Sequence, residues 1–264
     1  MTQFGYIETP YEHVITGVAD VQAIIDAMKA QLPAAGYTNP VGDEMKTPVD
    51  AAGRFMTLLP VRAAANRLQL SIRDDLGRVS TVREMQVASS PTVAIYFGAH
   101  YCYIENRVQA ESVWASMMSL WPAAENAHPD YHAMHGTRTS AGTDDGNGGT
   151  SRCIVWNQNT LAYQQERRFL GHVPLFVGLA RASRDRYTSG GRRWNARLVY
   201  GRDSGGYAIR GRLYNSLWIW RRLTRVGAIH PIPIDDATTG RFRVLNIPYI
   251  ASEAGERLAM VRVP

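Results

Sequence analysis

Cysteine and lysine are scarce in this chain, and long apolar runs are missing. Its 264 residues include two cysteines, Cys102 and Cys153, and two lysines, Lys29 and Lys46. Two cysteines far apart in the sequence cannot provide a disulfide framework, which indicates synthesis in a reducing cytoplasm. No segment approaches the roughly 18 consecutive apolar residues that a spanning helix requires, so we expect no membrane span.

Nucleotide-binding and calcium-binding motifs are also missing. Neither lysine follows a glycine-rich run, which excludes a P-loop, and no Rossmann fingerprint occurs. The sequence around Asp144 and Asp145 lacks the spaced carboxylates and the closing glutamate of an EF-hand. The sequence therefore predicts no cofactor.

Charge is distributed unevenly along the chain. Residues 181–225 contain twelve arginines and two acidic residues, a net charge of +10, although the whole chain carries only +6. Residues 1–50 contain seven acidic residues and two lysines, a net charge of −5. Because arginine makes planar, bidentate contacts and tolerates partial burial, this polarity indicates an interface with acidic groups.

The first part of the chain, up to residue 122, is predicted to contain both helices and strands. Apolar residues recur at helical spacing over residues 20–32, where Asp20 can cap the helix and Pro33 with Gly36 ends it. Alternating apolar residues then predict a hairpin over residues 68–87, with its turn at 74–77. Residues 93–97 and 101–104 predict two more strands, and residues 113–120 predict a second helix that Pro122 stops.

The glycine-rich segment 123–151 separates two compositionally different parts. We interpret it as an exposed loop between an α+β domain, residues 1–122, and a β-rich, arginine-rich domain, residues 152–264. Short strands are predicted in the second domain at 152–156, 174–181, 194–201, 206–213, 216–220, 242–247 and 258–263. The predicted fold class is α+β and β-rich, with a C-terminal antiparallel β-sandwich or small barrel.

One segment resembles an active-site loop. The run from Arg202 to Gly206, Arg-Asp-Ser-Gly-Gly, resembles the nucleophile loop of chymotrypsin-like serine proteases. That resemblance implies Ser204 as nucleophile and His100 as base, oriented by one of the carboxylates Asp130, Asp144 or Asp145. The family's usual glycine and proline around the loop are replaced here by Arg202 and Tyr207. A hairpin turn needs the same Asp, Ser and Gly residues, and we favour the hairpin.

Three histidines offer a weak metal-binding pattern. His128, His132 and His135 would face one way on a helix and could hold Zn²⁺ with one position open. Pro129 and the following glycines disfavour a helix, and no glutamate lies between the histidines as in metalloproteases. We therefore favour a histidine-rich loop without metal.

The arginine-rich segment alternates with aromatic residues. Arginines beside stacking platforms are typical of single-stranded nucleic acid sites, and also of protein–protein interfaces. Both possibilities remain open, with the protein interface favoured because the acidic residues 1–50 could face this segment on a neighbouring copy. The candidate interface residues are Arg181, Arg184, Arg186, Arg192, Arg193, Trp194, Arg197, Arg202, Arg210 and Arg212.

In its general organisation the chain resembles virion structural proteins of tailed bacteriophages. The resemblance rests on the short helix at 20–32, hairpins such as 70–79 and 206–214, and long glycine-rich loops. It implies a non-enzymatic component of a tail, neck or baseplate, located in the virion after synthesis in the host cytoplasm. Such components assemble as rings or oligomers, so the implied partners are further copies of the chain and other virion proteins.

Overall fold

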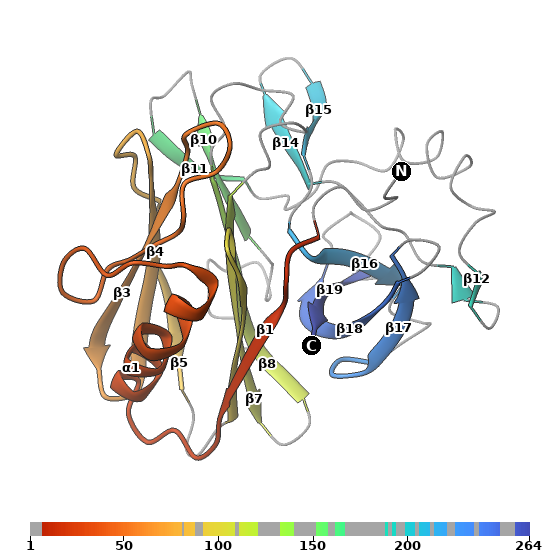
Figure 1. Ribbon diagram of the computed structural model, residues 1–264, viewed down its shortest axis with the longest axis horizontal. Helices are drawn as coiled ribbons and strands as arrows, with labels where there is room; N and C mark the ends of the chain where they lie inside the picture. The colour runs from red at the N-terminus through yellow and green to blue at the C-terminus, as the bar shows by residue number, and fades with distance from the viewer. Residues whose placement is uncertain are drawn as a thin grey trace.

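A computed structural model describes the chain in fifteen segments. These are residues 7–80, 82–87, 92–108, 111–120, 133–139, 152–157, 162–166, 188–189, 192–193, 199–203, 206–211, 214–220, 225–234, 238–248 and 257–264. In these segments the protein is β-rich, with a single α-helix and antiparallel sheets (Figure 1). The predicted α+β, β-rich fold class is confirmed. No helix of the described segments has the length and apolar character needed to cross a membrane.

The predicted first helix is present and packs as its periodicity indicates. Helix α1 covers Gln22–Gln31 and continues into the 3-10 helix η1, Leu32–Ala35. Its residues Ile24, Ile25 and Met28 are buried on one face. The carboxylate of Asp20 accepts a hydrogen bond from the N–H of Gln22 at 2.8 Å, which satisfies one of the free amides at the helix start.

Four strands form a sheet beside this helix, which we call the helix-side sheet. Its order is β2 (Met45–Lys46), β3 (Met56–Ala64), β4 (Arg67–Asp74) and β5 (Arg83–Gln86), all antiparallel. Strands β4 and β5 are the two arms of the predicted hairpin, which is confirmed. Buried apolar residues such as Leu58, Leu68 and Leu70 face the core.

Two loops of this sheet share one five-residue pattern, Asp-x-x-Gly-Arg, at residues 50–54 and 74–78. In the first loop, Asp50 Oδ1 accepts hydrogen bonds from the N–H groups of Ala52 and Arg54, at 2.8 and 2.9 Å. Its Oδ2 accepts from the Arg54 guanidinium at 2.7 Å. One carboxylate therefore holds the whole loop.

The second loop repeats this arrangement. Asp74 Oδ1 accepts from the N–H groups of Leu76 and Arg78, at 3.1 and 2.9 Å, and its Oδ2 is paired with the Arg78 guanidinium. The glycines Gly53 and Gly77 have φ values of 81° and 78°, a conformation that other residues adopt at a cost. The two loops share the Asp-x-x-Gly-Arg pattern because they share this hydrogen-bonded conformation.

The first of these loops should make stability depend on pH. Burial alone would raise the pKa of Asp50, but hydrogen bonds from Arg54 outweigh it and leave the pKa below its usual value. The loop's contribution is therefore complete above about pH 4, the usual pKa of aspartate, and is lost as pH falls through the lowered pKa. We expect Asp50→Asn to be clearly less stable than the parent in urea at pH 7, with the difference shrinking by pH 2–3.

An Ala51→Ser substitution in the same loop adds no ionisable group and serves as control. Its difference from the parent should be the same at both pH values. A constant difference for Asp50→Asn across the same range would contradict the assignment.

Seven strands build the central sheet, which we call the seven-stranded sheet. Its order is β1 (Tyr11–Ile15), β6 (Thr92–Gly98), β7 (Tyr101–Val108), β8 (Glu111–Leu120), β9 (Ala133–Thr139), β10 (Arg152–Asn157) and β11 (Ala162–Glu166). All neighbouring pairs are antiparallel. The two strands predicted at 93–97 and 101–104 are its β6 and β7.

Two predictions for residues 113–151 differ from the structure. Residues 113–120 are not a helix but part of β8, hydrogen-bonded between β7 and β9. The described end of β8, residues 116–120, is buried throughout because both faces of the sheet are covered. Its sequence Ser-Met-Met-Ser-Leu therefore lacks the alternation of a half-exposed strand. Strand β9 lies inside the predicted exposed loop 123–151, so the seven-stranded sheet continues across the expected domain boundary.

The C-terminal part contributes a four-stranded antiparallel sheet, which we call the C-terminal sheet. Its order is β16 (Ser216–Trp220), β19 (Arg257–Val263), β18 (Thr239–Pro248) and β17 (Ile229–Pro233). Two hairpins precede it, β12 (Thr188–Ser189) with β13 (Arg192–Arg193), and β14 (Val199–Asp203) with β15 (Gly206–Gly211). The strands predicted at 152–156, 206–213, 216–220, 242–247 and 258–263 are recognisable as β10, β15, β16, β18 and β19. The strand predicted at 194–201 overlaps the start of β14, and 174–181 lies outside the described residues.

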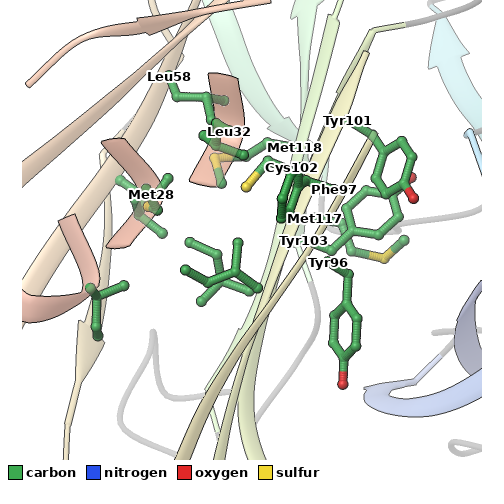
Figure 2. Packing of buried hydrophobic residues seen from close by; sticks show 14 of the residues in the cluster. Met28, Leu32, Leu58, Tyr96, Phe97, Tyr101, Cys102, Tyr103, Met117 and Met118 are labelled. Atoms are coloured by element: carbon green, nitrogen blue, oxygen red, sulfur yellow. The ribbon is translucent and has the colours of Figure 1, made fainter. Parts of the chain in front are cut away.

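The seven-stranded sheet lies between the helix-side sheet and the C-terminal sheet (Figure 1). On one side Met28, Leu32 and Leu58 of the helix and the helix-side sheet pack against Cys102 and its neighbours (Figure 2). On the opposite side the rings of Tyr96, Tyr101 and Tyr103 point away from this core, and β18 of the C-terminal sheet lies against β8. Strand β7 is therefore covered on both faces.

Candidate functional site: a polar seam on strand β7

Alternate residues of β7 connect the seven-stranded sheet to the C-terminal part, and we call these contacts the seam. The hydroxyl of Tyr101 accepts a hydrogen bond from Asn215 at 2.9 Å, and the hydroxyl of Tyr103 donates to the carbonyl of Tyr214 at 2.7 Å. Two residues further, the carboxylate of Glu105 accepts from Arg243 Nε at 2.9 Å. Residues at i, i+2 and i+4 of a strand share one face, which aligns the three contacts.

The first end of the seam is a buried ionic cluster around Glu105, which we call the Glu105 cluster. The Glu105 side chain has no exposed surface, and its Oε2 accepts hydrogen bonds from Tyr96, Arg107 and Arg243, at 2.7, 2.7 and 2.9 Å. Arg107 also bonds to the Tyr96 hydroxyl, and its guanidinium lies 3.5 Å from Glu12 of β1. Arg243 donates in addition to the carbonyl of Gly227 at 3.0 Å. A buried charge with this many partners ties three strands together.

The cluster shifts the pKa values of Arg107 and Tyr96. Burial lowers the pKa of Arg107, but the adjacent Glu105 carboxylate outweighs it and leaves the pKa above the usual value. Burial and the Glu105 charge both raise the pKa of Tyr96. Arg107 therefore stays charged and Tyr96 neutral near neutral pH, so both remain hydrogen-bonded to the Glu105 carboxylate.

The second end of the seam is organised around Glu8. Its carboxylate is hydrogen-bonded to Nδ1 of His100 and accepts the His100 backbone N–H at 3.1 Å. The Glu8 backbone N–H donates to Asn215 Oδ1 at 3.1 Å, and its carbonyl accepts from Asn215 Nδ2 at 2.9 Å and from Arg262 at 3.2 Å. Glu8 therefore joins the β6–β7 turn to β19 and to the residue before β16.

This geometry bears on the predicted Ser–His arrangement. The carboxylate that faces His100 is Glu8, whereas Ser204, Asp130, Asp144 and Asp145 all lie outside the described residues. Nε2 of His100 is buried and has no hydrogen-bond partner in the described part of the chain. Its ring lies 5.3 Å from the ring of Tyr214. The nitrogen that would act as base is therefore buried, although 17% of the His100 side chain is exposed.

The Asp-Ser-Gly-Gly segment lies in a hairpin. Strand β14 ends at Asp203 and β15 begins at Gly206, and these two residues are paired across the turn. The hairpin that we favoured for this segment is confirmed in the backbone pairing. The turn is tighter than expected, because Arg202 and Asp203 belong to the strand itself.

Three other side chains of β7 are held in their neutral form. Burial raises the pKa of the Cys102 thiol and of the Tyr101 and Tyr103 hydroxyls, so all three are neutral at physiological pH. The hydroxyl of Tyr37 donates to the carbonyl of Tyr101 at 3.0 Å, which holds the start of β7 from its other face. The hydroxyls of Tyr101 and Tyr103 and the carboxylates of Glu105 and Glu8 are thus all paired, whereas Nε2 of His100 has no partner among the described residues.

The candidate arginines are only partly described. Arg192 and Arg193 form β13, Arg202 lies in β14 and Arg210 in β15, so these four belong to the two hairpins. The remaining candidates lie outside the described residues: Arg181, Arg184, Arg186, Trp194, Arg197 and Arg212. Their role as an interface stays a prediction.

The acidic residues of the first fifty positions are largely paired within the chain. Glu8 pairs with His100 and Glu12 with Arg107, as described above. Four further pairs are Asp20–Arg62, Lys29–Asp43, Arg73–Glu44 and Arg54–Asp50, with the nearest atoms 2.5 to 3.0 Å apart. The seventh acid, Asp26, accepts a hydrogen bond from Gln22. Most acidic residues of the first fifty positions therefore have a partner in the same chain, and their contact with arginines of another copy stays a prediction.

The histidine pattern gains no support from the strand assignment. His135 lies on β9, opposite Ile154 and Met118, while His128 and His132 lie outside the described residues. Within the described segments, no three His, Cys, Asp or Glu side chains are grouped to hold a metal ion.

Comparison with known proteins adds no relative. No protein-family model matches the chain, and no curated protein shows significant similarity to it.

Sequence reasoning missed the residues that organise the seam. Glu105 carries a signal, because it follows the buried run Tyr101 to Ile104 in a strand that is apolar on both faces. An acid in such a strand requires a buried partner. Glu8 and Asn215 carry no local signal, since 207 positions separate them.

Proposed function

We propose that the chain is a non-enzymatic structural component of a tailed-phage virion, in the tail, neck or baseplate. The observation that carries this proposal is the seam, where the ionisable groups of Glu105, Arg107 and Arg243 are buried and used to join sheets. Charged side chains that are paired between sheets favour the interpretation of this protein as a rigid structural component rather than an enzyme. The general resemblance to virion structural proteins gives the proposal its biological setting.

The assembly contacts are proposed to lie on the arginine-rich segment. Because six of the seven acids in residues 1–50 have partners in the same chain, head-to-tail charge pairing would only exchange one ion pair for another. Exchange of exposed ion pairs contributes little free energy. The arginines are therefore better matched to an acidic surface outside residues 1–50, on another part of a neighbouring copy or on another virion protein.

Charge reversal tests the interface. We expect Arg192→Glu, Arg193→Glu and Arg197→Glu together to weaken assembly about tenfold or more, because they place like charges against an acidic surface. Light scattering at low and high salt, followed by negative-stain imaging, measures the assembly with and without the other virion proteins. Arg67→Glu, on the helix-side sheet, reverses one charge elsewhere, and it should leave assembly intact where the single Arg192→Glu already weakens it. Unchanged assembly of the triple variant would exclude this interface.

Nucleic acid is the second candidate partner, and the pairing of the N-terminal acids favours it. With those acids occupied, a polyanion from outside is a natural match for a segment of net charge +10. Binding of single-stranded DNA should then weaken steeply as salt rises, and the triple variant should flatten that slope. Absence of retention on DNA at low salt would remove this candidate.

The remote enzymatic alternative has its own decisive test. Hydrolase activity that Ser204→Ala abolishes would overturn both the assembly and the nucleic-acid proposals. We expect none, because His100 is enclosed by Glu8 and Tyr214.

A further inference from the structure

The two ends of the seam are held by different parts of the chain. The Glu105 cluster consists of strand residues that face each other directly, from β6, β7 and β18. The opposite end depends on residues 7–10, which precede β1 and belong to no strand. We call residues 7–10 the strap.

The strap contacts both the seven-stranded sheet and the C-terminal part of the chain. Ile7 packs against the small apolar core of the C-terminal sheet, which includes Ile232, Phe242 and Met260. The carboxylate of Glu8 is hydrogen-bonded to His100 in the β6–β7 turn, and the backbone of Glu8 is hydrogen-bonded to Asn215 and Arg262. Without the strap, the described hydrogen bonds across this end are those of Tyr101 with Asn215 and Tyr103 with Tyr214.

The turn that receives the strap is shaped for close approach. A Cβ atom placed on Gly98 would lie 2.8 Å from Glu8 Oε2 and 2.4 Å from the ring of Tyr101. Only glycine leaves room for the carboxylate to reach the His100 backbone N–H. The sequence at this turn therefore accommodates the strap specifically.

Closing the strap also holds two unfavourable features in place. Asn215 has φ of 47°, a left-handed conformation that non-glycine residues rarely adopt, and its side chain is fixed by Glu8 and Tyr101. Nε2 of His100 is buried without a partner among the described residues. Release of the strap would allow the backbone of Asn215 to relax and would expose Nε2 of His100 to water. Both effects offset part of the free energy that the strap's contacts contribute.

From these contacts we propose that residues 7–10 form a releasable strap that closes one end of the seam. When the strap leaves, the C-terminal sheet opens at the Asn215 end and stays joined at the Glu105 cluster. Strand β1 remains paired with β6, because the strap lies before its first residue. The inference is independent of the proposed virion role, since it concerns the chain alone.

Hydrogen exchange of the full chain tests the strap, using Glu8→Ala and, as matched control, Glu12→Ala in β1. The informative amides are Arg262, which donates to Asn215, and Leu120, which donates to His100, because neither bonds to the removed carboxylate. In Glu8→Ala we expect both to exchange about tenfold faster. The exchange rates of the Gly227 and Val244 amides, which lie beside Arg243, should change less than about twofold. Glu12→Ala should leave Arg262 and Leu120 unchanged.

A second variant guards against trivial unfolding. Asn215→Gly keeps the left-handed backbone but removes the bonds to the strap and to Tyr101, so it should open the same end. Protection of β3 and β4 reports that the remainder stays folded. Unchanged exchange at Arg262 in both variants, or equal acceleration at Arg262 and Val244, would overturn the proposal.

Discussion

Replacing Glu105 with alanine should lower the free energy of unfolding by about 3–5 kcal/mol, the usual cost of breaking a buried ion pair from one side. The substitution removes the shared carboxylate of Arg107 and Arg243, whose side chains are only 13% and 11% exposed. It also removes the acceptor of the Tyr96 hydroxyl. Since Arg243 belongs to β18, the loss should loosen the C-terminal sheet from the seven-stranded sheet.

Urea denaturation at neutral pH measures this change. Glu84→Ala provides the control, because Glu84 lies 3.6 Å from Arg67 with both side chains about half exposed. An exposed pair of this kind contributes less than about 1 kcal/mol. Replacing Glu105, Arg107 and Arg243 together with methionine should recover part of the loss, since no charge then remains buried. A cost below about 1 kcal/mol for Glu105→Ala would show that the cluster does not hold the sheets.

Replacing Asp74 with alanine should cost about 2–4 kcal/mol, because a buried acceptor of several hydrogen bonds disappears. The Asp74 side chain has no exposed surface and accepts from the N–H groups of Leu76 and Arg78 as well as from the Arg78 guanidinium. Arg78 is itself only 10% exposed in its side chain, so its charge loses a partner that solvent replaces poorly.

Thermal unfolding of Asp74→Ala beside Asp43→Ala separates loop geometry from charge. Asp43 is paired with Lys29 at 3.0 Å, but both side chains are partly exposed, so its removal should cost less than about 1 kcal/mol. Asp74→Asn should be intermediate, because the amide oxygen can still accept from the two N–H groups. Equal stability of the Asp74 and Asp43 alanine variants would contradict the role of the loop.

The first of these predictions follows from the position of β7 in the middle layer of a three-layer arrangement. A strand covered on both faces has no solvent for its polar side chains, so each polar group needs a partner from a neighbouring layer. Tyr101, Tyr103 and Glu105 find these partners in the C-terminal part. The same polar groups therefore decide how the layers are aligned.

Local patterns in the sequence determined the elements whose residues meet mostly near neighbours. The helix at 20–32 and the β4–β5 hairpin appear as expected, because the apolar spacing of both is visible in the sequence. The paired strands β6 and β7 were equally readable from the tight connection at residues 98–100. The β-rich class follows from the abundance of such short alternating segments.

Tertiary structure alone decided the rest. Residues 113–120 form a strand because neighbours on both sides supply hydrogen bonds, which overrides a spacing that also suits a helix. The pairing of Glu8 with His100 and Asn215 joins positions 92 and 207 residues apart, which no local pattern encodes. The net charge of residues 1–50 was visible in the sequence, but whether those acids were free depended on cations brought beside them by folding.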